Sequence, residues 1–206
     1  MTPLRIILVT LGVLGLIALV AFLSGIGLYN GMVTMRQRVD ASWAQVQNVY
    51  QRRADLVPNL VSTVSGAANF EKSTLIAVTD ARASVGRVQL PAAGAPTDPA
   101  QLAAFEQAQG QLGSALSRLL VVSEQYPDLK ATANFRDLQA QLEGTENRIT
   151  VERGNFNTAV QSFNTAVTSF PAALYAGFFH FKEKPYFTAT AGSDKAPAVN
   201  FDFNKK

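Results

Sequence analysis

The stretch that decides the fold is residues 135–170, FRDLQAQLEGTENRITVERGNFNTAVQSFNTAVTSF. Steps of three and four residues alternate along one seam: Phe135, Leu138, Leu142, Thr145, Ile149, Glu152, Phe156, Ala159, Phe163, Ala166 and Phe170. This heptad spacing is typical of a helix that buries one stripe against other helices, as in a coiled coil. Such a helix spans roughly 50 Å at about 1.5 Å per residue. Because most of the stability of a helix in a protein comes from packing of its apolar face, it needs partners of similar length.

Composition excludes several kinds of chemistry. The 206 residues include no Cys and one His, with a net charge of +3. Disulfides, thiolate metal sites and Cys nucleophiles are therefore excluded, as are His-based metal cages. No concentrated basic face points to nucleic acid, and no Gly-rich phosphate loop is present. We expect no metal, no cofactor and no enzyme, since the sequence shows neither a nucleophile–base pair nor a metal cluster.

Residues 6–28 form the first structural unit, after a short N-terminal tail at 1–5. This run of 23 residues carries no charge and is rich in Leu, Val and Ile. At about 1.5 Å per residue it spans roughly 35 Å, enough to cross a bilayer core of about 30 Å. The alternative is a cleaved signal peptide, but the run is longer than an ordinary signal core and lacks small residues at the cleavage spacing. We predict a retained single-pass transmembrane helix.

The orientation of this helix is encoded by few charges. Arg5 precedes the span, and Arg36 and Arg38 follow it. Counting Lys and Arg by the positive-inside rule favours a cytoplasmic domain by a narrow margin, which leaves a periplasmic one open.

A second seam predicts the first helix of the soluble domain, from about Met32 towards Gly66. Its positions are Met35, Val39, Ser42, Val46, Val49, Arg53, Leu56 and Leu60, widened by Trp43, Tyr50, Val57 and Val64. Pro58 lies inside this helix, and proline removes one backbone donor and clashes with the preceding turn. We therefore expect a kink or a break near residues 54–57.

Three further helices follow in the sequence. Asn69 is suited to cap the second helix. Residues 88–98 contain Pro91, Gly94 and Pro96 and are followed by Pro99, so we predict an irregular, mobile loop. Pro99 suits the first position of a third helix that ends near Glu124. The long fourth helix starts near Asp128 and ends at residue 170.

Several motifs resemble those of the LemA family. They are Tyr29-Asn30, RRADLVPNLV at 52–61, Ala81-Arg82, EQYPDLK at 124–130, Asn134-Phe135, ENRI at 146–149 and Phe170-Pro171. The resemblance implies a bacterial single-pass membrane protein with an antiparallel helical-bundle domain at 29–171. Family members are linked to envelope stress, proteolysis or the shaping of internal membranes, so the resemblance implies a fold rather than a reaction.

The combined expectation is an all-α chain: an N-terminal transmembrane helix, an antiparallel four-helix bundle with long helices, and an irregular aromatic tail at 172–206.

In an up-down bundle, residues at equal distance from the membrane end lie at equal height. Arg53 lies 21 residues beyond Met32, and Glu152 lies 18 residues before Phe170. We therefore predict a buried polar layer that pairs Arg53 with Glu152 and Asp55 with Arg148. Such a layer fixes helix register; the alternative is an ion or proton site, or a switch that opens the bundle.

The tail returns to the membrane end and is rich in aromatic residues. Its candidate interfacial residues are Tyr175, Phe178, Phe179, Phe181, Lys182, Lys184, Tyr186 and Phe187. Aromatic rings and Lys suit the headgroup zone of a bilayer. The alternative is that the rings cover the open end of the bundle. Val199, Phe201 and Phe203 alternate with polar residues, as in a short strand.

We expect a membrane-anchored scaffold or adaptor in the cytoplasmic membrane of a bacterium. Its partners would be the lipid bilayer and either a second copy of the chain or another membrane protein, with no nucleic acid. The alternative is a regulatory subunit of a membrane protease or transporter.

Overall fold

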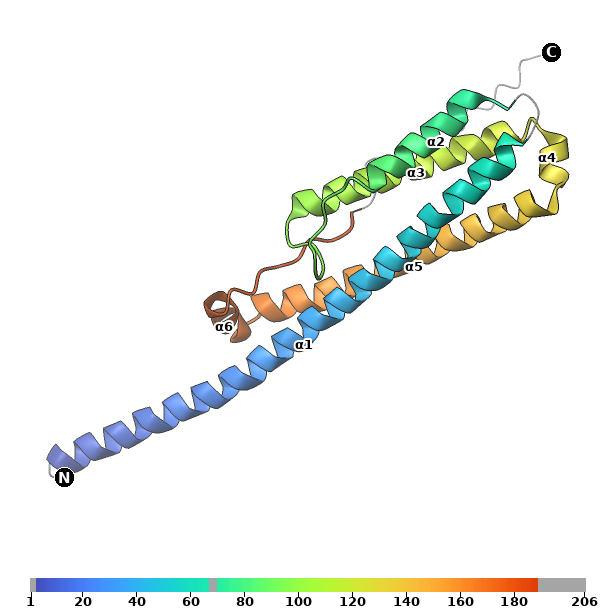
Figure 1. Ribbon diagram of the computed structural model, residues 1–206. Coiled ribbons are helices and arrows are strands. Elements are labelled where there is room, and N and C mark those ends of the chain that lie inside the picture. The colour runs from blue at the N-terminus through green and yellow to red at the C-terminus, as the bar shows by residue number, and fades with distance from the viewer. Residues whose placement is uncertain (1–2, 67–69, 189–206) are drawn as a thin grey trace, which may run out of the picture.

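The structure, a computed structural model, describes residues 3–66 and 70–188, and these residues form helices without strands. In chain order the helices are α1 (Pro3–Ser65), α2 (Lys72–Val85), α3 (Pro99–Ser123), α4 (Pro127–Ala131), α5 (Ala133–Thr168) and α6 (Ala172–Phe178). Figure 1 shows α1 and α5 running side by side in opposite directions, with α2 and α3 as a second antiparallel pair on top of them. The predicted all-α bundle with an N-terminal apolar helix is confirmed. The predicted strand at Val199, Phe201 and Phe203 lies outside the described residues.

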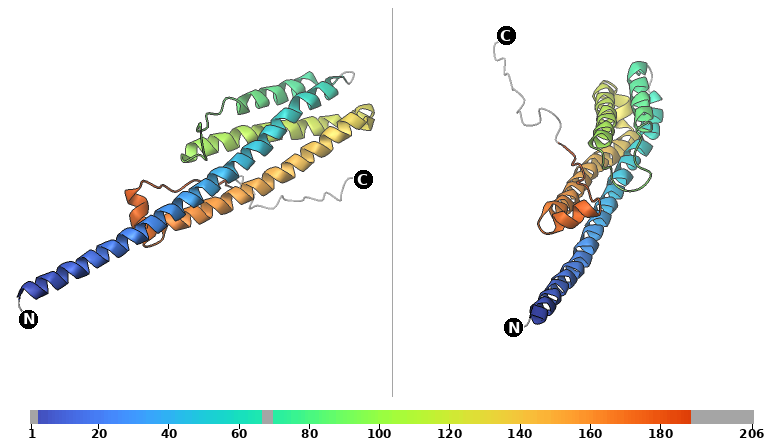
Figure 2. Two further views of the ribbon diagram at one scale, coloured as in Figure 1. Left: turned by 60° about the horizontal axis from the view of Figure 1, so that its bottom comes forward. Right: turned by 90° about the vertical axis from the view of Figure 1, so that its left-hand side faces the viewer.

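The N-terminal part of α1 projects beyond the bundle, as Figure 2 shows. The apolar run 6–28 and the first helix of the domain are one continuous helix of 63 residues. Within the described chain, α1 is the helix that is long and apolar enough to cross a membrane. The large side chains of the run, such as Leu14 and Phe22, are exposed, so the run is not a core helix of the bundle.

The helix α1 also runs through Pro58, so the predicted break is wrong. Proline has no backbone N–H, which leaves the carbonyl of Ala54 without its usual partner four residues later. Arg82 of α2 supplies the missing donor: its Nε donates to the Ala54 carbonyl oxygen at 3.0 Å. A side chain from the neighbouring helix thus replaces the lost backbone hydrogen bond.

The boundaries of the other helices follow from their caps. Asp98 accepts a hydrogen bond from Ala100 N at 2.8 Å, with Pro99 at the first helical position, as predicted. The N-cap position of α2 belongs to Glu71, whereas the predicted cap Asn69 lies outside the described residues. The predicted fourth helix is in two pieces, because Thr132 has an extended backbone and caps α5 by accepting from Phe135 N at 3.4 Å. The short α4 precedes it.

The core consists of two apolar clusters at different heights of the bundle. The membrane-side cluster contains residues of α1 and α5 such as Trp43, Tyr50, Phe156 and Phe163, together with Phe105 of α3. The distal cluster is built from Val57, Leu60, Val64, Val78, Leu112, Leu116, Leu119, Leu129, Phe135 and Leu142. Arg53 lies between the two clusters along α1.

The α1 seam differs from its predicted position by part of a turn. Its buried residues are Val39, Trp43, Val46, Tyr50, Arg53, Val57, Leu60 and Val64, an unbroken heptad pattern. Met35, Ser42, Val49 and Leu56 lie at the edge of the buried stripe. The bulky rings of Trp43 and Tyr50 define the centre of the stripe. At the end of the other long helix, Phe170 is 84% exposed rather than part of the seam.

Candidate functional site

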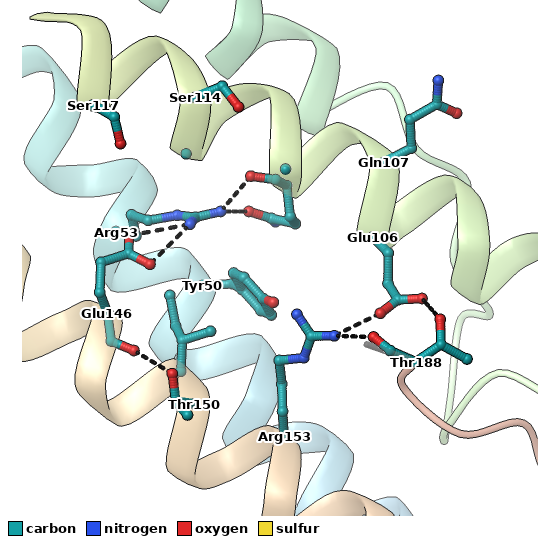
Figure 3. A pocket seen from close by; sticks show the side chains of 14 residues that line it. Tyr50, Arg53, Glu106, Gln107, Ser114, Ser117, Glu146, Thr150, Arg153 and Thr188 are labelled. Carbon is teal, nitrogen blue, oxygen red and sulfur yellow. Dashed lines mark hydrogen bonds and ion pairs between the residues drawn. The ribbon is translucent and has the colours of Figure 1, made fainter. Parts of the chain in front are cut away.

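A polar groove opens between α3 and α5, with α1 as its floor (Figure 3). Its volume is about 860 Å³. The groove extends from Thr188 and Glu106 at the membrane side to Ser117 and Glu146 at the distal side. The backbones of α3 and α5 are not closely packed along the groove, and side chains such as Arg153 and Glu106 link the two helices across it. We call this site the α3–α5 groove.

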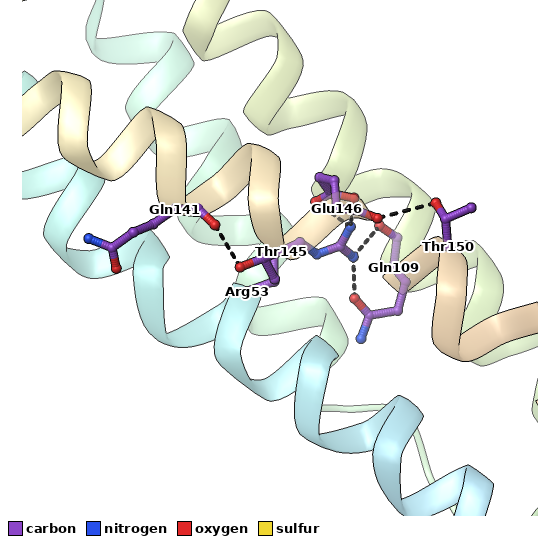
Figure 4. Close-up of polar contacts among 6 residues, drawn as sticks. All are labelled: Arg53, Gln109, Gln141, Thr145, Glu146 and Thr150. Carbon is purple, nitrogen blue, oxygen red and sulfur yellow. Dashed lines mark hydrogen bonds and ion pairs between the residues drawn. The ribbon is translucent and has the colours of Figure 1, made fainter. Parts of the chain in front are cut away.

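Arg53 joins three helices at one end of the α3–α5 groove (Figure 4). It is 3% exposed. Its Nη1 donates to both carboxylate oxygens of Glu146, at 3.1 and 3.3 Å, and its Nη2 donates to the main-chain oxygen of Gln109 at 2.9 Å. The Nη2 also donates to the side-chain Oε1 of Gln109. The guanidinium therefore braces α1 against α3 and α5.

The second ion pair, between Arg153 and Glu106, lies about two turns of α5 nearer the membrane than Glu146. Arg153 Nη2 donates to Glu106 at 2.7 Å and to the Thr188 carbonyl oxygen at 3.1 Å. Its guanidinium also lies over the Phe187 ring, 4.6 Å from the centroid. Arg153 thus ties the end of the described tail to both walls of the groove.

Tyr50 lies between the two arginines in Figure 3. Burial raises its pKa above the ordinary value, although the positive charges of Arg153 and Arg53 act in the opposite direction. The phenol is therefore neutral at physiological pH. With two arginines facing Glu106 and Glu146, the groove offers both hydrogen-bond donors and acceptors without net charge.

The structure corrects the predicted partners of Arg53. Arg53 is buried, but its carboxylate is Glu146; Glu152 is half-buried and accepts a hydrogen bond from Asn155 Nδ2 at 3.0 Å. Glu146, Thr150 and Arg153 lie three and four residues apart and so share the stripe of α5 that faces α3. Glu152 is six residues from Glu146 and therefore points elsewhere.

Asp55 and Arg148 are both exposed and do not form a buried pair. Asp55 accepts instead from Gln51 Nε2 at 2.7 Å on the same helix. Residues two apart on a helix differ by about 200° around its axis, so Asp55 cannot share the inward face of Arg53. Counting heights along the helices ignores this rotation.

The structure divides the predicted interfacial tail into two parts. Phe187 is buried in the membrane-side cluster with the half-buried Phe181 packed against it, and Lys184 is also buried. Tyr175 is half-buried against α1. The exposed members are Phe178, Phe179, Lys182 and Tyr186.

Two asparagines of α5 hold the extended segment 181–188 along the helix. Asn164 donates from Nδ2 to the Lys184 carbonyl and accepts from its N–H through Oδ1, both at 2.9 Å. Asn157 makes the same pair of contacts with Phe187, at 3.0 and 2.9 Å. Each amide side chain therefore satisfies a donor and an acceptor of the tail backbone, as a neighbouring strand would.

Lys184 and Asp40 fasten the loop between α2 and α3 to the same region. The Nζ of Lys184 donates to the Ala95 carbonyl at 3.0 Å and lies 3.4 Å from Asp40 Oδ1, which in turn accepts from Ala95 N at 2.9 Å. Gly94 has φ +75°, and a Cβ there would lie 3.0 Å from Asp40. The loop predicted to be mobile is thus held against the core.

The sequence did not predict Glu146 as the partner of Arg53, nor the roles of Gln109, Asp40, Asn157 and Asn164. Asn157 and Asn164 lie seven residues apart beside an apolar seam, which is a detectable pattern for inward-facing polar groups. Gln109 interrupts the apolar stripe of α3 in a similar way. Nothing in the local sequence distinguishes Asp40 from a surface carboxylate.

The fold and its continuous apolar helix define a membrane-associated antiparallel helical bundle. The chain belongs to the LemA family, whose family model matches residues 42–201. Magnetosome protein MamQ 2 of Paramagnetospirillum magneticum is 27% identical over 204 residues, covering 88% of this chain and 73% of that protein. Magnetosome protein MamQ of Magnetospirillum gryphiswaldense is 27% identical over 203 residues, covering 88% and 72%. Protein LemA of Metamycoplasma hominis is 23% identical over 137 residues, covering 66% and 58%.

These relationships and the exposed apolar part of α1 support a single-pass membrane protein. A contact within the chain adds to this interpretation, because the Tyr175 hydroxyl donates to the Ala21 carbonyl at 2.9 Å. Cleavage of residues 6–28 as a signal peptide would remove that partner.

Proposed function

We propose that the protein is a non-enzymatic, membrane-anchored adaptor or scaffold of the bacterial envelope, with its bundle on the cytoplasmic side. The α3–α5 groove carries this proposal. It is open to solvent, about 860 Å³ in volume, and framed by two ion pairs that link its helices and fix their spacing. A site of fixed shape on a domain tied to the bilayer by α1 is suited to hold a partner rather than to transform a substrate.

The lining of the groove favours a polypeptide as its occupant. Its arginines already face carboxylates, so an anion such as a phosphate would gain no unpaired positive charge there. Hydroxyl groups of Ser114, Ser117 and Thr150, together with the carboxylates, can match the N–H and C=O groups of a peptide backbone. We therefore propose that a segment of a second copy or of another membrane protein docks in the groove.

A pair of glycine substitutions tests this proposal. Gly110 lines the groove and Gly154 does not, and at both positions an added Cβ meets nothing within 4 Å. Gly110→Trp fills the groove, whereas Gly154→Trp adds the same side chain elsewhere on the bundle. Tryptophan is a better helix former than glycine, so both variants should fold.

The full-length wild type and both variants are crosslinked in native membranes, purified and analysed by mass spectrometry. We expect a partner that is retained by Gly154→Trp and lost by Gly110→Trp. A partner that is a second copy, also seen when the purified protein self-assembles, supports a scaffold; a stoichiometric membrane protein supports a regulatory subunit. Equal recovery of all partners with both variants would contradict docking in the groove.

A further inference from the structure

The short helix α6 is apolar on all sides. Its sequence AALYAGF contains no charged residue. Ala172 and Ala176 face the bundle and are buried. On the other side Leu174 and Phe178 are 68% and 75% exposed, and Phe170, in the turn before α6, is 84% exposed. Leu174 and Phe178 lie four residues apart on one stripe of α6, so α6 presents a bare apolar face that the described chain does not cover.

Contacts with α1 fix the position of α6 along the apolar run. The Tyr175 hydroxyl donates to Ala21 O at 2.9 Å, and a Cβ at Gly25 would lie 2.7 Å from the Tyr175 ring. Only glycine permits this close packing. One turn further on, Tyr29 packs against Phe179 with ring centroids 4.8 Å apart. The helix α6 therefore lies beside residues 21–29 of α1.

This position corresponds to the edge of a bilayer. A hydrocarbon core of about 30 Å takes about 20 helical residues. Counted from Ile6, the first residue of the apolar run, these residues end at Gly25, the residue that Tyr175 contacts. The first charged residue of α1 past the run is Arg36, whose guanidinium lies over the Phe181 ring at 5.5 Å, and Lys182 is exposed. The bare face of α6 is thus level with the hydrocarbon boundary, and these charges lie on its aqueous side.

We infer that α6 is a second membrane contact: Phe170, Leu174 and Phe178 insert into the outer part of the leaflet from which α1 emerges. The occupant of the apolar face is lipid, because the face is continuous with the apolar surface of the membrane-spanning part of α1. The insertion adds a second point of membrane contact beside α1, which limits tilting of the bundle and fixes which side of it leans towards the membrane. The inference rests on α1 spanning the bilayer and is independent of the groove.

The absence of cysteine permits a direct test. Leu174→Cys and Phe178→Cys each provide a single site for an environment-sensitive fluorophore on the full-length protein, incorporated at one copy per lipid nanodisc. Val121→Cys is the matched control, since Val121 is an exposed apolar residue of α3 at the distal end of the bundle. Quenching is measured with aqueous iodide and with lipids that carry a nitroxide near the head or near the end of the acyl chain.

For the labels at positions 174 and 178 we expect iodide quenching at least about threefold lower than at position 121, since interfacial helices bury their apolar face in lipid. The shallow nitroxide should quench them more than the deep one, and neither should quench the label at position 121. Iodide quenching equal to that at position 121 would overturn the inference. So would protection from iodide without quenching by either lipid nitroxide, because protein rather than lipid would then cover α6.

Discussion

The two halves of the bundle are closed in different ways. The distal half, beyond Arg53, packs side chains of α1, α2, α3 and α5 into an apolar cluster, with the short α4 contributing Leu129. The membrane-side half lacks such helical cover. Its cluster is completed by Ala95 of the loop between α2 and α3 and by Phe187 of the tail. The backbone N–H and C=O groups of a helix bond one another, whereas those of a loop or an extended tail need partners from other parts of the chain.

The difference shows where the polar residues of this chain are needed. The membrane-side half contains Asp40, Asn157, Asn164 and Lys184, each bonded to the backbone of an irregular segment. We therefore expect the membrane-side half to depend on a few polar contacts in addition to apolar packing, and the distal half to depend mainly on apolar packing.

Removing the Phe187 ring should have the largest effect. The ring is 5% exposed and contacts Trp43 and Phe156 at centroid distances of 6.0 and 5.3 Å. Phe187→Ala should lower the free energy of unfolding by about 3 kcal/mol, through lost burial and the cavity left behind. In hydrogen exchange, the amides of Lys184 and Phe187 should lose protection while those of residues 57–64 keep theirs.

The neighbouring Tyr186, which is 41% exposed, provides the control for this change. Tyr186→Ala should cost far less and leave both amides protected. Equal loss of protection in the two halves after Phe187→Ala would show that they unfold as one unit, which would contradict a separate dependence of the membrane-side half on its tail.

Asp40→Ala should have the next largest effect. It leaves the ammonium of Lys184, whose side chain is 6% exposed, without a carboxylate, and it also removes the acceptor for Ala95 N. Because Asp40 is itself a quarter exposed, we expect a loss of about 2 kcal/mol, below the full cost of breaking a buried pair. Urea unfolding of the full-length protein in nanodiscs measures it.

Asp55→Ala on the same helix is the matched control, since Asp55 is exposed and its partner among the described residues is Gln51 of the same helix. It should change stability by less than about 0.5 kcal/mol. If the two aspartate variants were equally stable, the loop would not depend on Asp40.

The boundary between the halves can be tested at Arg53 and Glu146. Glu146→Leu strands a buried guanidinium that keeps only Gln109, and we expect a loss of about 1–2 kcal/mol because the Glu146 side chain is 44% exposed. Adding Arg53→Leu should recover part of this loss, since an apolar pair would join the two clusters. Thermal unfolding of the two single variants and the double variant measures the coupling; strictly additive losses would argue against a shared layer.

Much of the fold was predictable because heptad spacing survives in the sequence of every long helix. The seam of residues 135–170 required long partners, and α1 and α3 supply them. The Arg53 position was recognisable because a charge interrupted an apolar stripe. Its partner was not, because counting residues from the helix ends estimates height and leaves the rotation of each side chain undefined. Glu146 and Glu152 differ by less than two turns in height but face different directions.

The irregular segments were less predictable for another reason. Periodicity describes a regular backbone, and residues 88–98 and 181–188 have none. Their positions depend on long-range hydrogen bonds such as that from Lys184 to Ala95, across 89 residues. The up-down order of the helices indicated that the tail returns to the membrane end, but the division into the docked Phe187 and the exposed Phe178 depends on which rings meet Trp43.

The smallest predicted effect concerns Pro58, where a side chain of α2 bonds a backbone carbonyl of α1 in the distal half. Arg82→Ala should cost about 1 kcal/mol, because it leaves the Ala54 carbonyl without the Nε donor at 3.0 Å. In a Pro58→Ala background the new N–H can bond that carbonyl, so the same Arg82 change should cost almost nothing. A double-mutant cycle by urea unfolding measures the difference.

An equal cost of Arg82→Ala in both backgrounds would mean that Arg82 acts through some other contact. A coupling of the expected sign would show that the rule of the membrane-side half also applies to a regular helix: wherever the backbone lacks a partner, a distant polar side chain supplies one.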